Sequence, residues 1–146
     1  MVIPDLVSRD REGVLREMVL YLKKKNYVSK EKQLYEKLLQ RENLGSTAIA
    51  DGIAIPHCKF KGVKNALVLL AISRQGVNFN SLDGKPSHLF FLVISSPDNP
   101  SLNLQILAAI ACLVRKAPSL REKILGAENK EMILNIIREE EEKIDE

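Results

Sequence analysis

The stretch Arg41–Lys59, RENLGSTAIADGIAIPHCK, contains the side chains best suited to chemistry. His57 follows an Ile-Pro pair, and the residue before a proline is pushed towards extended backbone. We therefore expect the imidazole to stand where a short strand ends. A neutral imidazole is a competent nucleophile near neutral pH, and a phosphoramidate formed on it can pass the phosphoryl group onward. The alternative is a structural histidine held by backbone hydrogen bonds.

Arg41 is the candidate partner of such a phosphoryl group, because a guanidinium fork matches the oxygens of a doubly charged anion. Ser46, Thr47 and nearby backbone N–H groups are candidates for further hydrogen-bond donors. The alternatives are a cation near a helix C-terminus for Arg41 and ordinary loop polarity for Ser46 and Thr47. Residue types alone leave these alternatives open.

Other chemistry is less well supported. Cys58 adjoins His57, but consecutive residues of an extended segment point to opposite sides, which argues against a Cys-His hydrolase. A metal site needs three or four ligands, and neither His57 nor His88 has a nearby cluster of them. We interpret His88 as structural, and we expect no metal or organic cofactor.

Composition favours a globular protein of one domain, residues 1–146, with 45% hydrophobic and 28% charged residues. The net charge is only +3, and the densest lysine cluster, Lys23–Lys25, lacks the interleaved aromatic residues typical of nucleic-acid binding. We see no signal peptide and no apolar run of the roughly 20 residues that a membrane span needs. We therefore expect a cytoplasmic protein that binds no nucleic acid, and a homo-oligomer remains possible.

Hydrophobic periodicity predicts helices, then strands, then helices, which indicates an α/β fold with a mixed sheet flanked by helices on both sides. Arg74–Gly76 is expected to form a turn, and the acidic tail 139–146 is expected to fray. Ser29 is the expected N-cap of the second helix. The predicted helices are 10–25, 30–42, 101–116, 119–125 and 131–138, and the predicted strands are 53–55, 66–73, 77–79 and 88–95. We expect the helix over 101–116 to be buried against the sheet, because apolar residues occupy most of its circumference.

Taken together, these residues resemble the enzyme IIA domains of the fructose/mannitol class. That class belongs to the bacterial phosphoenolpyruvate-dependent sugar phosphotransferase system and includes the nitrogen-regulatory IIA proteins. The resemblance covers nearly the whole chain, and it is carried by Arg41-Glu42, Gly45-Ser46-Thr47, Gly52, Ala54-Ile55-Pro56-His57, Lys59, Leu82–Pro86, His88–Leu92 and the helices after Leu104.

The resemblance implies a role for each site residue. A phosphorylated histidine carrier protein would pass its phosphoryl group to His57, and Arg41 would help to hold it. Family members usually have a second active-site histidine where this chain has Asn103. A carboxamide can replace one hydrogen bond of an imidazole but carries no charge, so the departure bears on onward transfer more than on acceptance.

We therefore expect a phosphoryl carrier with His57 as acceptor and with Arg41, Ser46, Thr47 and Asn103 as phosphoryl-binding neighbours. A domain without fused IIB or IIC segments, together with Asn103, favours the nitrogen-regulatory branch. The alternatives are a sugar-transport IIA subunit that donates to a IIB domain, and a non-catalytic binding module of the same fold.

Overall fold

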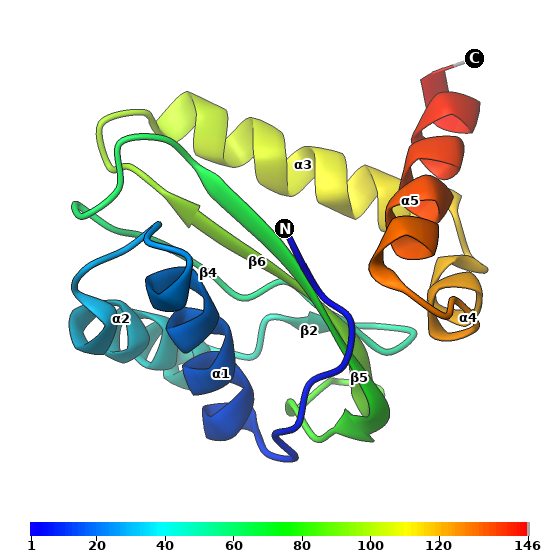
Figure 1. The fold of residues 1–146 in the computed structure, drawn as a ribbon, viewed down its shortest axis with the longest axis horizontal. Coiled ribbons are helices and arrows are strands. Elements are labelled where there is room, and N and C mark those ends of the chain that lie inside the picture. The colour runs from blue at the N-terminus through cyan, green and yellow to red at the C-terminus, as the bar shows by residue number, and fades with distance from the viewer. Residues whose placement is uncertain (146) are drawn as a thin grey trace.

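A mixed β-sheet runs through the centre of the protein, with helices on both faces (Figure 1). The computed structural model describes residues 1–145, and within them six strands pair in the order β1-β5-β6-β3-β2, with β4 also pairing with β6. This confirms the predicted fold class. The strands are β1 (Val2–Ile3), β2 (Ala48–Ile49), β3 (Ile53–Ala54), β4 (His57–Lys59), β5 (Leu67–Val77) and β6 (Ser87–Ser95), and the helices are α1 (Arg11–Lys24), α2 (Glu31–Leu44), α3 (Pro100–Lys116), α4 (Leu120–Leu125) and α5 (Lys130–Asp145).

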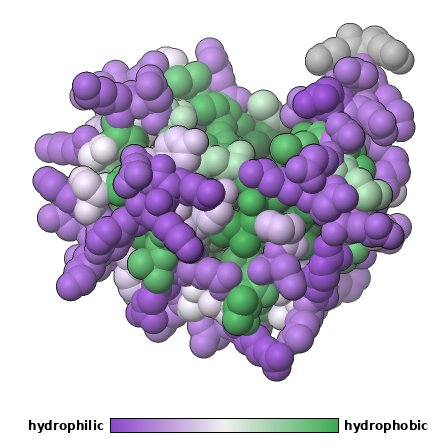
Figure 2. Space-filling model, viewed as in Figure 1, coloured by the Kyte–Doolittle hydropathy of each residue, from purple (hydrophilic) through white to green (hydrophobic). Residues whose placement is uncertain are grey.

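The two long antiparallel strands β5 and β6 carry apolar side chains on both faces, as expected for a sheet covered on both sides. On one face, Phe90 and Leu92 belong to a core shared with α1 and α2. On the other face, Phe91 and Val93 belong to a core shared with α3, α4 and α5. Figure 2 shows polar side chains over the outer helices and apolar side chains in the hollow between them.

The expected turn at Arg74–Gly76 is wrong, because these residues lie inside β5. The register of β5 against β6 shifts between Ile72 and Val77, so this segment is a bulge. Gly76 has φ +85°, and a Cβ there would lie 2.9 Å from Cε1 of His88. Glycine therefore allows the strand to continue through the irregularity.

Three predicted helix features also need correction. The second helix begins at Glu31 without a side-chain cap, so Ser29 is not its N-cap. The acidic tail stays helical to Asp145, because Glu140 is buried and accepts a hydrogen bond from Lys123; Glu146 lies outside the described residues. The helix α3 is less buried than predicted, since Leu104 is 68% exposed.

The described residues contain no helix that is both long enough and apolar enough to cross a membrane.

Asp83 ties the turn before β6 to the turn before β3. Its carboxylate accepts from the backbone N–H of Lys85 and the hydroxyl of Ser81, at 3.0 and 2.7 Å, and from the N–H of Asp51 at 3.4 Å. The backbone hydrogen bond from Lys85, followed by that from Ser81, lowers the pKa of Asp83 below its ordinary 3.8. The ionised carboxylate therefore stabilises the fold above that value, and this contribution is lost as the pH falls through the lowered pKa of the folded protein.

We predict that Asp83→Asn lowers the midpoint of thermal unfolding at about pH 6, and that the difference from wild type shrinks as the pH falls through the lowered pKa of Asp83 in the folded protein. Circular dichroism melts across this range check the prediction. Asp5→Asn, at an exposed aspartate outside these turns, is the control. A difference that does not depend on pH would contradict a role for the charge.

Candidate active site

His57 lies at an open edge of the sheet. Both β3 and β4 pair with β6 in parallel, one after the other, and Ile55 and Pro56 separate them. The strand β2 covers the outer side of β3 but not that of β4. His57, the first residue of β4, is therefore left half-buried at an edge that no strand in the described part of the chain covers.

The backbone sets the tautomer of His57. Its Nδ1 lies 2.7 Å from the carbonyl oxygen of Ile55. A carbonyl oxygen only accepts hydrogen bonds, so Nδ1 carries the hydrogen and donates it. The lone pair is consequently on Nε2, which makes Nε2 the nucleophilic atom of the ring.

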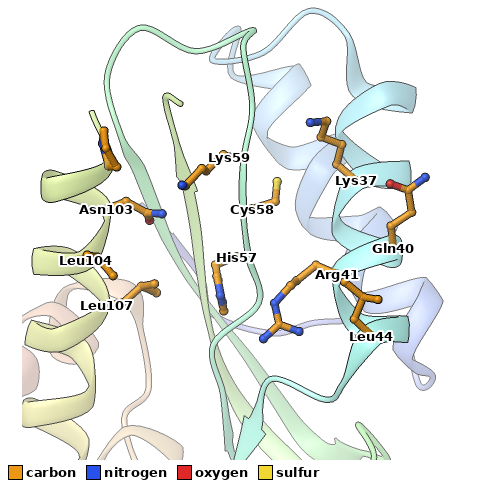
Figure 3. A pocket seen from close by; sticks show the side chains of 11 residues that line it. Lys37, Gln40, Arg41, Leu44, His57, Cys58, Lys59, Asn103, Leu104 and Leu107 are labelled. Carbon is orange, nitrogen blue, oxygen red and sulfur yellow. The ribbon is translucent and has the colours of Figure 1, made fainter. Parts of the chain in front are cut away.

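A pocket of about 550 Å³ surrounds this imidazole, between the C-terminal half of α2 and the first turns of α3. Figure 3 shows the side chains of Arg41, from α2, and Asn103, from α3, directed into the space around His57 from opposite sides. The structure thus brings together three of the five residues predicted for the site. The residues lining the pocket are Lys37, Gln40, Arg41, Leu44, His57, Cys58, Lys59, Pro100, Asn103, Leu104 and Leu107.

The charged residues of the lining are all cations. They are Lys37, Arg41 and Lys59, and no carboxylate accompanies them among the described residues. Arg41 donates one N–H to the carbonyl of Gly45 at 2.8 Å, which leaves other donors of the guanidinium fork for an anion. A phosphoryl group on Nε2 would therefore enter a field of positive charge.

Asn103 lies in the first turns of α3, whose N-cap Asn99 accepts from the backbone N–H of Leu102 at 3.3 Å. The Asn103 side chain is buried, and its Oδ1 has no hydrogen-bond partner in the described part of the molecule. Unpaired buried polar atoms are uncommon and often mark sites that bind a further group. Because Oδ1 only accepts hydrogen bonds, it is the N–H₂ group of the same side chain that could donate to an anion in the pocket.

Ser46 and Thr47, predicted as direct phosphoryl ligands, do not line the pocket. The Ser46 hydroxyl donates to the carbonyl of Phe79 and accepts from the N–H of Ala48. The Thr47 hydroxyl donates to the buried carboxylate of Glu42, and the Thr47 backbone N–H donates to the same carboxylate at 3.0 Å. In this arrangement both hydroxyls hold the loop in place.

Cys58 points away from His57, towards the core under α1 and α2 (Figure 3). Burial raises the pKa of its thiol to about 12, with a smaller opposing effect of the nearby Lys37 cation. The thiol is therefore protonated near neutral pH and is a poor nucleophile. His88 does not line the pocket; its Nδ1 lies 2.9 Å from the carbonyl of Ser73.

Sequence reasoning missed that Lys37, Gln40 and Leu44 line the pocket. A signal was present, because residues three or four apart lie on one helical face. Lys37 and Leu44 stand four and three residues from Arg41, and Gln40 stands three residues from Lys37 and four from Leu44. On α3, Leu107 stands four residues from Asn103, and Leu104 stands three residues from Leu107. Lys59 was part of the recognised pattern, but it was not assigned to the site.

The fold and the pocket define a class: an α/β domain with a nucleophilic imidazole in a cationic pocket at the sheet edge. The chain matches the family “Phosphoenolpyruvate-dependent sugar phosphotransferase system, EIIA 2” over residues 1–140, and it belongs to that family. The chemistry of the family is phosphoryl transfer through a histidine.

Relatives of both transport and regulatory description match the chain. It is 33% identical over 135 residues to the fructose-specific EIIABC component of Bacillus subtilis, with 92% of this chain and 21% of that protein covered. It is 32% identical over 104 residues to the nitrogen regulatory protein of Pseudomonas aeruginosa, with 71% and 67% covered. The chain thus spans only about a fifth of the length of the Bacillus protein.

Solved structures agree on the fold. Nitrogen regulatory protein IIA-Ntr from Neisseria meningitidis superposes with a TM-score of 0.84 at 29% identity, covering 93% of this chain and 92% of that one. The IIA mannitol structure from Escherichia coli superposes with a TM-score of 0.77 at 19% identity, covering 93% and 94%. The second likeness supports the fold alone.

Proposed function

We propose that this chain reversibly accepts a phosphoryl group on Nε2 of His57 from a phosphorylated histidine carrier protein. In this reaction an N–P bond to His57 forms as the N–P bond to the carrier breaks. The observation that carries the proposal is the free Nε2 in a pocket whose charged residues are all cationic. Arg41 and Lys59 would stabilise the charge on the transferred group, and Asn103 would contribute its amide.

The rim of the pocket suits a protein partner. Leu44 is 86% exposed and Leu104 is 68% exposed, and they belong to α2 and α3 on its two sides. Exposed leucines around a reactive group are typical of the apolar centre of an interface, where a docked partner excludes water. The carrier would seat on these leucines and present its phosphohistidine to His57.

The test is incubation with phosphoenolpyruvate, enzyme I and the carrier protein, followed by intact mass measurement at neutral pH. We expect one added phosphoryl group, and none when the carrier is left out. Because phosphoramidates hydrolyse in acid, the added mass should disappear after acid treatment. Unmodified protein after the complete reaction would favour a non-catalytic binding module of the same fold.

Within this function we favour a cytoplasmic regulatory protein of the nitrogen-regulatory type. The uncharged Asn103 supports this choice, since a pocket without a second imidazole can accept a phosphoryl group but has no titratable group on α3 to assist its departure. The close superposition with a nitrogen regulatory protein also supports it. The regulatory output would then be a phosphorylation-dependent contact with another protein.

A sugar-transport subunit that donates to a IIB domain is the second candidate. It is favoured by the long match to a fructose-specific EIIABC component and by the fold shared with IIA mannitol, which has been solved in complex with phosphorylated IIB mannitol. For this candidate, onward transfer must be efficient despite Asn103. A kinetic comparison can therefore separate the two.

We predict that Asn103→His accelerates transfer from phosphorylated protein to a IIB domain by roughly 10- to 100-fold, because an imidazole adds a general acid to the pocket. Stopped reactions followed by mass measurement give the rate. Gln105→His, at an exposed position of the same helix, is the matched control. An unaltered rate for Asn103→His would show that the asparagine does not limit onward transfer.

A further inference from the structure

Glu42 is a buried carboxylate next to Arg41, with only 2% of its surface exposed. Burying a carboxylate is costly unless hydrogen bonds satisfy it. Here one residue satisfies both oxygens: the backbone N–H of Thr47 donates to Oε2 at 3.0 Å, and the Thr47 hydroxyl donates to Oε1. The end of α2 is thereby tied to the start of β2.

The contacts continue from Thr47 to the imidazole. The carbonyl of Thr47 accepts from the backbone N–H of Ile55 at 3.1 Å. The carbonyl of Ile55 in turn accepts from Nδ1 of His57 at 2.7 Å. A continuous path of hydrogen bonds and two intervening residues therefore joins the buried carboxylate to the reactive ring.

The same loop also supports the guanidinium group. Arg41 precedes Glu42 on α2 and donates to the carbonyl of Gly45, two residues before Thr47. The hydrogen bonds between Glu42 and Thr47 thus hold the loop whose backbone carbonyls orient the side chain of Arg41 and, through Ile55, the ring of His57. Errors of about 1 Å in such supports can cost on the order of 100-fold in rate.

We propose that Glu42 is a positioning residue for phosphoryl transfer. Through Thr47 and the carbonyl of Ile55 it keeps the His57 ring in the tautomer with Nδ1 protonated and Nε2 free. The effect on transfer rests on the proposed function of His57, whereas the effect on the tautomer does not.

Two substitutions test this path at different points. Glu42→Gln keeps the volume but exchanges one acceptor oxygen for an N–H₂ donor, so one Thr47 donor loses its partner. Thr47→Val removes the hydroxyl and keeps the backbone N–H. Thr47→Ser restores the hydroxyl and should restore the wild-type properties. The matched control is Glu17→Gln, because the Glu17 carboxylate accepts from the backbone N–H groups of Val7 and Ser8 and does not line the pocket.

The primary measurement is ¹⁵N NMR of the histidine rings in unphosphorylated protein, above the pH at which the rings titrate. We expect wild type, Thr47→Ser and Glu17→Gln to show His57 with Nδ1 protonated. We expect Glu42→Gln and Thr47→Val to show a mixture of tautomers and phosphoryl acceptance slowed roughly 10- to 100-fold.

A wild-type tautomer of His57 in folded Glu42→Gln and Thr47→Val would overturn the proposal, even if their thermal unfolding midpoints fall. Should Glu42→Gln fail to fold, Thr47→Val decides the question. If wild type accepts no phosphoryl group but the tautomer still responds to these substitutions, the proposed function fails and the positioning role of Glu42 stands.

Discussion

Replacing His57 with alanine is expected to abolish phosphoryl acceptance. The reaction needs a lone pair that can form a bond to phosphorus, and in this structure the Nε2 of His57 supplies it inside the pocket. Intact mass after incubation with phosphoenolpyruvate, enzyme I and the carrier should show unmodified protein. The methyl group of alanine leaves the edge strand β4 free to pair with β6, so folding should be retained.

His88→Ala is the control for this prediction. It removes the other histidine of the chain, which contacts the carbonyl of Ser73 outside the pocket. Folded His88→Ala should still accept one phosphoryl group. Circular dichroism shows whether the variant is folded. Phosphorylation of His57→Ala together with its loss in folded His88→Ala would show that the wrong histidine had been assigned.

Arg41→Met is expected to slow phosphoryl acceptance by roughly 100- to 1,000-fold, which is the usual effect of losing a preorganised donor to transition-state charge. Methionine keeps much of the aliphatic stem and removes the charge. The rate follows from the time course of intact mass at a fixed concentration of phosphorylated carrier.

Two further variants separate charge from position. Arg41→Lys keeps a cation but loses the planar guanidinium group, which can donate to the carbonyl of Gly45 and to a phosphoryl group at the same time. It should therefore recover only part of the rate of phosphoryl acceptance. Arg16→Met is the control, because Arg16 stacks on Tyr35 at 4.9 Å and does not line the pocket. Equal rates for Arg41→Met and wild type would exclude Arg41 as the electrostatic partner.

Local interactions explain why much of the fold could be predicted. The helix that begins at Arg11 is capped by Asp10, whose carboxylate accepts from the N–H of Gly13 at 2.6 Å. The cap and the helix that it starts are made by residues close together in the chain. Within the strand β6, Leu89–Ile94 is an uninterrupted apolar run, which is typical of a strand buried on both faces. Errors arose where distant residues decide the outcome, as in the acidic tail, which Lys123 holds through Glu140.

In the candidate site, too, local sequence identified some residues, and contacts between distant residues decided the others. His57, Arg41 and Asn103 were found from residue type and from a family pattern, and the pocket contains all three. The assignment of Ser46 and Thr47 as direct ligands depended on where their hydroxyls point. Those hydroxyls meet Phe79 and Glu42 instead, and such contacts follow from the path of the folded loop.

The sequence by itself determined the candidate histidine, its likeness to a family and most of the succession of helices and strands, because side-chain chemistry and hydrophobic periodicity are properties of the local chain. Only the tertiary structure decided which tautomer His57 adopts, which cations surround it and how Glu42 reaches it. These features depend on distances between α2, β4 and α3, which are set when the two faces of the sheet are packed.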